Sequence, residues 1–156
     1  MENELLLGDI LKAKKLTIAT AESFTGGLFG KKITDIPGSS EYFLGGIIAY
    51  SYKAKEKLLK VNKRTLAKYG AVSAETAKEM ATNVKNILNA DIGVSFTGVA
   101  GPSLQEGKPA GLVYIGISYN NTLVFKEKFG GSRIEIREKS VDFAIEKLIN
   151  LIGGKT

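Results

Sequence analysis

The stretch that decides the fold is "IATAESFTGG", residues 18–27. It continues an apolar run that is typical of a buried strand, and it ends in Glu22, Ser23 and the glycine pair Gly26 and Gly27. A strand that turns through a serine into a glycine pair is a common way to begin a helix. We therefore predict a strand over 16–21, a turn that carries Ser23, and a helix from the glycine pair to about Thr34.

Helical and strand-like segments alternate along the rest of the chain. Hydrophobic spacing and turn residues predict these segments: helices at 3–14, 52–60, 63–69, 74–88 and 133–152, strands at 42–50 and 91–98, and a β-hairpin over 111–129 that turns at "NN". This order predicts a single domain over residues 1–156, a three-layer α/β/α fold with a mixed, mostly parallel sheet.

The carboxyl ends of three predicted strands carry polar, glycine-rich segments. These segments are "AESFTGG", "AYSYKAK" and "TGVAGP". Ligands bind in open α/β sheets beyond the carboxyl ends of the strands. If the three strands are parallel, the three segments meet at one rim of the sheet and form the candidate site.

Composition limits the chemistry of that site. The 156 residues include no histidine and no cysteine, which excludes a Ser-His-Asp triad, a thiol nucleophile and nearly every zinc site. A serine enzyme made from these residues needs a lysine, a tyrosine or a carboxylate as its base. We expect no metal and no cofactor. The chain has no apolar run of about 18 residues and no secretion signal, so we expect a cytoplasmic protein that does not enter a membrane.

Ser23 has two readings. It could cap the following helix, since serine is a favoured N-cap residue. It could also be a nucleophile, with backbone N–H groups near Gly26 and Gly27 stabilising an oxyanion or a phosphate. The stretch is not a Walker A loop, because "TGGLFGKK" does not match that motif at either end.

Lys55 lies at an unusual place on its predicted helix. At about 100° per residue, Lys53 and Lys57 share a solvated basic face, whereas Lys55 falls between Leu58 and Leu59 in the apolar arc. A lysine in that position either extends its amine to the surface or is held in a partly dry site. Burial would lower its pKa and make a neutral amine available as a base.

Three further polar positions lie at the predicted strand ends. Tyr50 could form a hydrogen bond in the pocket of Lys55 or could be a buried core tyrosine. Thr97 and Gly98 begin "TGVAGP", which is either a simple strand-to-loop turn or a backbone cradle that also offers a hydroxyl group.

Basic residues indicate an anionic partner. The net charge is +6, and Arg133 and Arg137 lie four residues apart near the start of the last helix. They could share a phosphate, which suits arginine geometry, or form a solvated face balanced by Glu135 and Glu138. The lysine-rich stretch 53–68 could contact nucleic acid, but it has neither a reader motif nor an aromatic stacking platform, so we disfavour that partner.

Together these segments resemble a known family. The matching stretches, in chain order, are "TAESFTGG", "ITDIPGSSEYFLGGIIAYSYKAK", "YGAVS", "FTGVAGP", "KPAGLVYIGI" and "GSRIEIR". They are similar to the C-terminal domain of CinA (competence/damage-inducible protein A) and to its stand-alone relatives, the nicotinamide-nucleotide amidases. The resemblance spans nearly the whole chain and implies hydrolysis of the carboxamide of nicotinamide mononucleotide to nicotinate mononucleotide and ammonia, in pyridine nucleotide salvage.

The resemblance also implies roles for individual residues. Ser23 corresponds to the family nucleophile, Lys55 to the base, and Tyr50 to the tyrosine of the same segment. For substrate binding, the resemblance implies Thr97 and Arg137. From their places in the same segments we also expect Thr25, Gly26, Gly27, Gly98 and Arg133 to bind substrate. Two features depart from the family pattern: Phe24 stands where a small residue is usual, and the loop "SLQEG" (103–107) lacks the usual glycine-rich turn.

The sequence therefore predicts a cofactor-free amidohydrolase acting on a phosphorylated nucleotide, and we expect a homo-oligomer. We expect no activity of the kind that belongs to the N-terminal domain of the larger family members. Two alternatives remain open: a non-catalytic module that binds nucleotides or a partner, and a basic nucleic-acid-binding domain.

Overall fold

The computed structural model describes residues 1–153 and consists of six α-helices, one short 3₁₀ helix and five strands within that range. The elements, in chain order, are α1 (Glu2–Lys14), β1 (Ile18–Glu22), α2 (Leu28–Thr34), η1 (Ser39–Glu41), β2 (Phe43–Ile48), α3 (Tyr52–Leu59), α4 (Lys63–Tyr69), α5 (Ala74–Ile87), β3 (Ile92–Gly98), β4 (Leu112–Tyr119), β5 (Asn121–Lys128) and α6 (Arg133–Ile152). None of the helices in the described range is long and apolar enough to cross a membrane.

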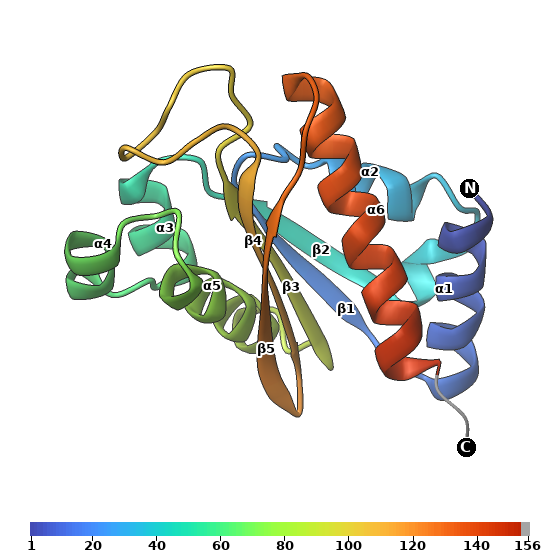
Figure 1. The fold of residues 1–156 in the computed structure, drawn as a ribbon. Helices are drawn as coiled ribbons and strands as arrows, with labels where there is room; N and C mark the ends of the chain where they lie inside the picture. The colour runs from blue at the N-terminus through green and yellow to red at the C-terminus, as the bar shows by residue number, and fades with distance from the viewer. Residues whose placement is uncertain (154–156) are drawn as a thin grey trace.

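The five strands form one mixed sheet with the order β2-β1-β3-β4-β5. Strand β1 pairs in parallel with β2 and with β3, while β4 is antiparallel to both β3 and β5. Four strands therefore point one way and only β4 points the other. The carboxyl ends of β1, β2 and β3 lie at the same rim, as the sequence predicted (Figure 1).

Helices cover both faces of the sheet. Helices α1, α2 and α6 lie on one face and α3, α4 and α5 on the other, which confirms the predicted three-layer α/β/α fold (Figure 1). Large apolar side chains fill the first interface, from Phe29 of α2 to Leu148 of α6. The second interface is thinner, because β1 presents only Ala19 and Ala21 to Leu59 of α3 and its neighbours.

Small and polar residues of β3 let α5 approach the sheet closely. Ile92, Val94 and Phe96 belong to the apolar cluster on the α6 side. Successive strand residues point to opposite faces, so Gly93 and Ser95 face α5, where the Ser95 hydroxyl donates to the Ala77 carbonyl at 2.7 Å. The close packing of α5 against the sheet fixes the position of this helical layer. The layer also contains α3, which carries Lys55.

Two details differ from the sequence expectations. Strand β2 ends at Ile48, so Tyr50 lies in the following turn, and with 63% of its surface exposed it is not a core residue. Leu58, expected in the apolar arc of α3, is half exposed, whereas Leu59 is fully buried. The predicted hairpin is confirmed, with Tyr119 opposite Asn121 across a turn at Asn120.

Replacing Gly93 with alanine tests the seating of α5. A Cβ at this position would collide with the backbone carbonyl oxygen of Ala81 and come within 3.1 Å of the Lys85 backbone nitrogen. Overpacking of this kind costs about 1–3 kcal/mol, so we expect Gly93→Ala to lower the urea midpoint. Gly130→Ala is the control, because nothing lies within 4 Å of a Cβ there. Equal midpoints for the two variants would contradict the close packing.

Candidate active site

Ser23 and Lys55 form the centre of the site. Ser23 follows the last residue of β1, and its backbone N–H donates to the Phe96 carbonyl of β3 at 2.9 Å, which fixes it at the strand end. Lys55 lies in the first turn of α3, whose start is capped by the Ser51 side chain. Its Nζ lies 2.8 Å from Ser23 Oγ, and both residues are buried.

The hydrogen bonds of Lys55 orient its amine. Besides Ser23 Oγ, Nζ contacts the carbonyl oxygens of Ala49 at 3.0 Å and Tyr50 at 3.1 Å. A lysine ammonium donates three hydrogen bonds, whereas a neutral amine has two N–H groups and one lone pair. The two carbonyls can only accept, so they hold the two N–H groups of a neutral amine. Its lone pair then faces the Ser23 hydroxyl.

Burial makes the neutral amine accessible near neutral pH. Lys55 is 1% exposed, and burial lowers its pKa from 10.5 to about 8, while the negative charge of Glu106 acts in the opposite direction. The prediction that Lys55 lies in a dry site is therefore confirmed. The alternative, in which its amine reaches the surface, is wrong.

Glu22 is a residue of the site that the sequence reasoning missed. Its buried carboxylate accepts hydrogen bonds from the Thr25 hydroxyl at 2.7 Å and from the backbone N–H groups of Gly27, Phe29 and Gly30 at 3.0–3.2 Å. These N–H groups are the free donors of the first turn of α2, and an acidic group is favourable there. A glutamate just before a serine-glycine turn was the available signal.

The position of Glu22 decides between the two readings of Ser23. The Ser23 side chain does not cap α2, because the Glu22 carboxylate already fills that place. Its hydroxyl is bonded to Lys55 instead. The cap reading of Ser23 is therefore wrong.

The same carboxylate changes the expected oxyanion donors. The Gly27 N–H is held by Glu22, and the Gly26 N–H donates to the Ser23 carbonyl at 3.1 Å, so neither is free for a substrate. The Thr25 hydroxyl is also engaged. Among residues 1–153, the backbone N–H groups of Phe24 and Thr25 have no hydrogen-bond partner. They are the free donors next to Ser23 in the chain, and within the same described residues the N–H group of Ala100, which lines the Ser23 cavity, has no partner either.

Arg133 and Arg137 reach the site from α6. Arg133 donates to the Gly101 carbonyl at 2.7 Å and to the Tyr50 hydroxyl at 3.1 Å. Arg137 donates to the Thr25 carbonyl at 2.8 Å, and its buried Nε has no partner. Within the described part of the chain, neither arginine forms an ion pair: Glu135 caps α6 and Glu138 pairs with Lys32. Arg133 is exposed and Arg137 is half-buried, so the expected solvated face holds for Arg133, but neither arginine pairs with these two acids.

A small cavity opens at Ser23. Its volume is about 20 Å³, and it is lined by Ser23, Phe24, Tyr50, Gly98, Ala100, Gln105 and Arg133. This is room for about one water molecule. Thr97 is not among the lining residues, because its hydroxyl donates to the Ala71 carbonyl at 2.7 Å. Gln105, in the loop that departs from the family pattern, is a lining residue that the sequence reasoning did not name.

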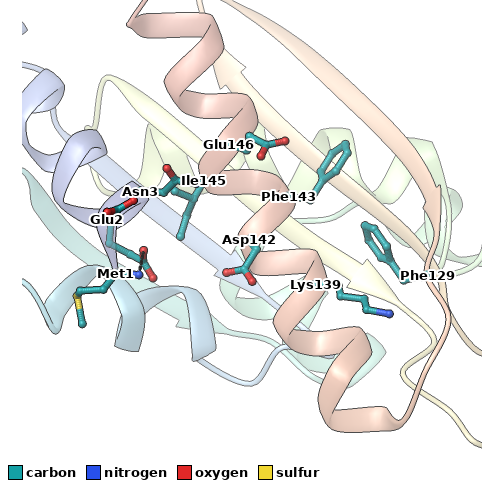
Figure 2. Close-up of a pocket in the computed structure, with 10 residues that line it drawn as sticks. Met1, Glu2, Asn3, Phe129, Lys139, Asp142, Phe143, Ile145 and Glu146 are labelled. Carbon is teal, nitrogen blue, oxygen red and sulfur yellow. Dashed lines mark ion pairs between the residues drawn. The ribbon is translucent and has the colours of Figure 1, made fainter.

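A larger hollow lies elsewhere. Figure 2 shows it between α1 and α6, with a volume of about 550 Å³ and with Glu2, Asp142 and Phe143 among its lining residues. It contains neither Ser23 nor Lys55, so its size does not make it the reactive site. Among the residues that the structure describes, no cluster of three acidic residues has the geometry to hold a metal.

Comparison with known proteins identifies the family of the chain. Residues 2–152 match the model of the CinA C-terminal domain. The chain belongs to this family. A competence-damage inducible protein of Desulforamulus reducens is 45% identical over 153 residues, which are 97% of this chain and 37% of that protein. The counterpart in Bacillus subtilis is 46% identical over 92% of this chain and 35% of its own length.

Solved CinA-family structures share the fold. The competence or damage-inducible protein of Enterobacter asburiae superimposes with a TM-score of 0.95 at 31% identity, over 97% of this chain and 96% of that one. The protein CihA of Agrobacterium tumefaciens gives a TM-score of 0.90 at 37% identity, with the same coverage. The chain thus spans about a third of the sequence relatives but nearly all of these two structures. The names of these relatives state no reaction.

Proposed function

We propose that this CinA-family domain is a nicotinamide mononucleotide amidohydrolase that uses Ser23 as nucleophile and Lys55 as base. The observation that carries the proposal is the 2.8 Å contact between Lys55 Nζ and Ser23 Oγ, with the amine buried and its two other hydrogen bonds directed to carbonyls. The choice of nicotinamide mononucleotide as substrate is supported by the sequence resemblance described above.

Acylation uses the neutral form of Lys55. The amine takes the proton of the Ser23 hydroxyl while Oγ attacks the carboxamide carbon, giving a tetrahedral oxyanion. The free N–H groups of Phe24 and Thr25 are the donors available to stabilise that charge. The Lys55 ammonium then gives its proton to the departing nitrogen, and ammonia leaves an acyl ester on Ser23.

Deacylation repeats the sequence with water. Lys55, neutral again, takes a proton from a water molecule that attacks the ester carbon. The acid product leaves as the proton returns to Ser23 Oγ. The sum is carboxamide plus water to carboxylate plus ammonium, so no metal or redox partner is needed.

The arginines of α6 provide a place for the phosphate. Within the described residues, Arg137 has a buried, unpartnered Nε, and both arginines are bonded only to neutral oxygens. An isolated guanidinium without a counter-ion suits a phosphate, which can accept two parallel hydrogen bonds. Arg137, with Arg133 beside the Ser23 cavity, is therefore assigned to the phosphate of the substrate.

Removing the Ser23 hydroxyl tests the nucleophile. We expect Ser23→Ala to fold normally and to release almost no ammonia from nicotinamide mononucleotide, because the attacking oxygen is gone. The measurements are ammonia release and circular dichroism. A folded Ser23→Ala protein with near-normal turnover would exclude the covalent mechanism. A folded wild-type protein that releases no ammonia would favour the non-catalytic binding module, and binding to a generic DNA duplex that weakens steeply with salt would favour the nucleic-acid alternative.

The pH profile tests the base. Only neutral Lys55 can accept the serine proton, so activity should rise with pH through about 8, where burial has placed the pKa of Lys55. Lys55→Arg should be nearly inactive over this range, since arginine keeps its proton. Lys53→Arg, on the exposed side of α3, should behave as wild type. If the two variants have the same rates between pH 6 and 9, Lys55 is not the base.

Arg137→Ala tests the phosphate contact. A hydrogen bond to a charged group contributes about 1.5–3 kcal/mol, so we expect kcat/KM for the mononucleotide to fall about 10- to 100-fold. The dephosphorylated nucleoside, which has nothing for Arg137 to hold, should lose much less. Arg137 also holds the Thr25 carbonyl, so Arg137→Ala could shift the backbone beside Ser23. Such a shift would lower kcat/KM for both compounds equally, and comparing the two separates it from the loss of the phosphate contact. Equal losses would remove Arg137 from the phosphate site.

A further inference from the structure

The turn over 105–108 carries an acidic residue in a costly conformation. Gln105 and Lys108 exchange two backbone hydrogen bonds at 2.8 and 3.1 Å, and between them Glu106 and Gly107 both have positive φ, at 56° and 73°. Glycine adopts this region freely, but a glutamate does so at a cost. The contacts made by the Glu106 side chain explain why the turn accepts it.

The Glu106 carboxylate joins the turn to the helical layer that carries Lys55. It accepts from the backbone N–H groups of Ala71 at 2.8 Å and Val72 at 3.1 Å, and from the Tyr52 hydroxyl of α3. The left-handed φ of Gly70 and its missing Cβ allow this approach, because a Cβ there would meet the carboxylate. One side chain thus holds two backbone groups before α5 and the first residue of α3.

Lys108 completes the same contact from the other end of the turn. Its Nζ donates to the carbonyls of Tyr69 and Val72 and lies 3.1 Å from Glu106 Oε1. Ala71 is held in turn by the Thr97 hydroxyl at the end of β3. Segment 69–72 is therefore bound through its N–H groups by Glu106, and through its carbonyls by Lys108 and Thr97.

This turn forms one wall of the Ser23 cavity. Gln105 directly precedes Glu106 and lines the cavity with Ser23 and Arg133. Gly101, at the start of the same loop, accepts the hydrogen bond of Arg133. A shift of the turn would therefore move Gln105, which lines the Ser23 cavity. It would also move the Gly101 carbonyl that holds Arg133, another lining residue.

Glu106 also acts on Lys55 through its charge. Lys55 Nζ itself contacts the Ser23 hydroxyl and the carbonyls of Ala49 and Tyr50. The charged and titratable groups joined to these neighbours are Arg133 of α6, which is bonded to the Tyr50 hydroxyl, and Glu106 with Lys108 on the loop, where Glu106 is bonded to Tyr52 of the same helix. Of these charges, that of Glu106 raises the pKa of Lys55, against the larger lowering by burial. Burial raises the pKa of Glu106 itself, but its hydrogen bonds with Tyr52, Ala71, Val72 and Lys108 together lower it by more, so the pKa lies below its usual value and the carboxylate is ionised at neutral pH.

We propose that Glu106 is a positioning residue of this site: its carboxylate fixes the 105–108 turn against Tyr52 and segment 69–72, and so sets both the wall beside Ser23 and the electrostatic environment of Lys55. The part that concerns turnover rests on the proposed amidohydrolase function. The contact itself and its effect on Lys55 do not.

The test is Glu106→Gln, which keeps the size of the side chain, removes the charge and replaces one acceptor oxygen with an NH₂ group. The protein is labelled with ¹³C at lysine Cε, and the Lys55 resonance is identified by its loss in Lys55→Arg. Removing a nearby negative charge disfavours the protonated amine, so we expect the titration midpoint of Lys55 to move to lower pH. We also expect kcat/KM at its pH plateau to fall, by up to about 100-fold if the wall is displaced by about 1 Å.

Glu79→Gln is the matched control. Glu79 also accepts a backbone N–H, that of Asn62 at 2.8 Å, and a threonine hydroxyl, that of Thr65, but it joins α5 to α4 and does not border the cavity. It should leave both the Lys55 midpoint and kcat/KM at the wild-type values. Tyr52→Phe is the second variant, because it removes one contact and keeps the charge. It should lower kcat/KM and leave the Lys55 midpoint unchanged.

A folded Glu106→Gln protein with the wild-type Lys55 midpoint, or with wild-type kcat/KM at the plateau, overturns the proposal. If Glu106→Gln does not fold, a Tyr52→Phe protein with wild-type kcat/KM overturns it. If the wild-type protein releases no ammonia, the proposed function fails. In that case, comparing the titration midpoint of the Lys55 amine in Glu106→Gln with that in Glu79→Gln still decides whether Glu106 acts on the amine.

Discussion

The structure depends on keeping one lysine amine out of water without giving it an acidic partner. Lys55 Nζ is surrounded by one hydroxyl and two carbonyls, and no carboxylate of residues 1–153 touches it. A salt bridge at this place would favour the charged amine and raise its pKa. Neutral acceptors satisfy its hydrogen bonds without that effect, so burial dominates and the pKa falls to about 8. The site can then supply a base in a chain that has no histidine.

Two glutamates organise the backbone around this amine from opposite sides. Glu22 gathers the first N–H groups of α2, and Glu106 gathers those of Ala71 and Val72. Each carboxylate binds backbone N–H groups and a hydroxyl. Glu22 contacts no lysine or arginine within residues 1–153, and the only one that Glu106 contacts there is Lys108. The acids therefore fix the loops at the ends of β1 and β3, and the base remains unpaired.

The fold could be read from the sequence because hydrophobic periodicity and turn residues determine it locally. The alternation of helices and strands predicted three layers. The position of Lys55 in the apolar arc of its helix made burial one of two readings, and the structure decides for it, although Leu58 proved exposed. The site could be predicted only in part. Glu106 acts through hydrogen bonds to Ala71 and Val72, which lie near it only in the folded chain. Glu22 binds residues close to it in sequence, but through a turn with positive φ at Gly26 and Gly27 that composition does not reveal. For that reason the free N–H groups were expected at the glycine pair and lie instead at Phe24 and Thr25.

The small size of the Ser23 cavity follows from the same arrangement of charges. Arg133 lies against it because its guanidinium, lacking an acidic partner, is bonded to the Gly101 carbonyl and the Tyr50 hydroxyl. Both are neutral acceptors, whereas a phosphate adds the attraction of opposite charges and can accept two parallel hydrogen bonds from one guanidinium. A phosphate arriving with the proposed substrate would thus outcompete them and draw Arg133 away from Tyr50. In the proposed reaction, the Arg133–Tyr50 contact beside the Ser23 cavity is thus the one that the substrate's own charge replaces.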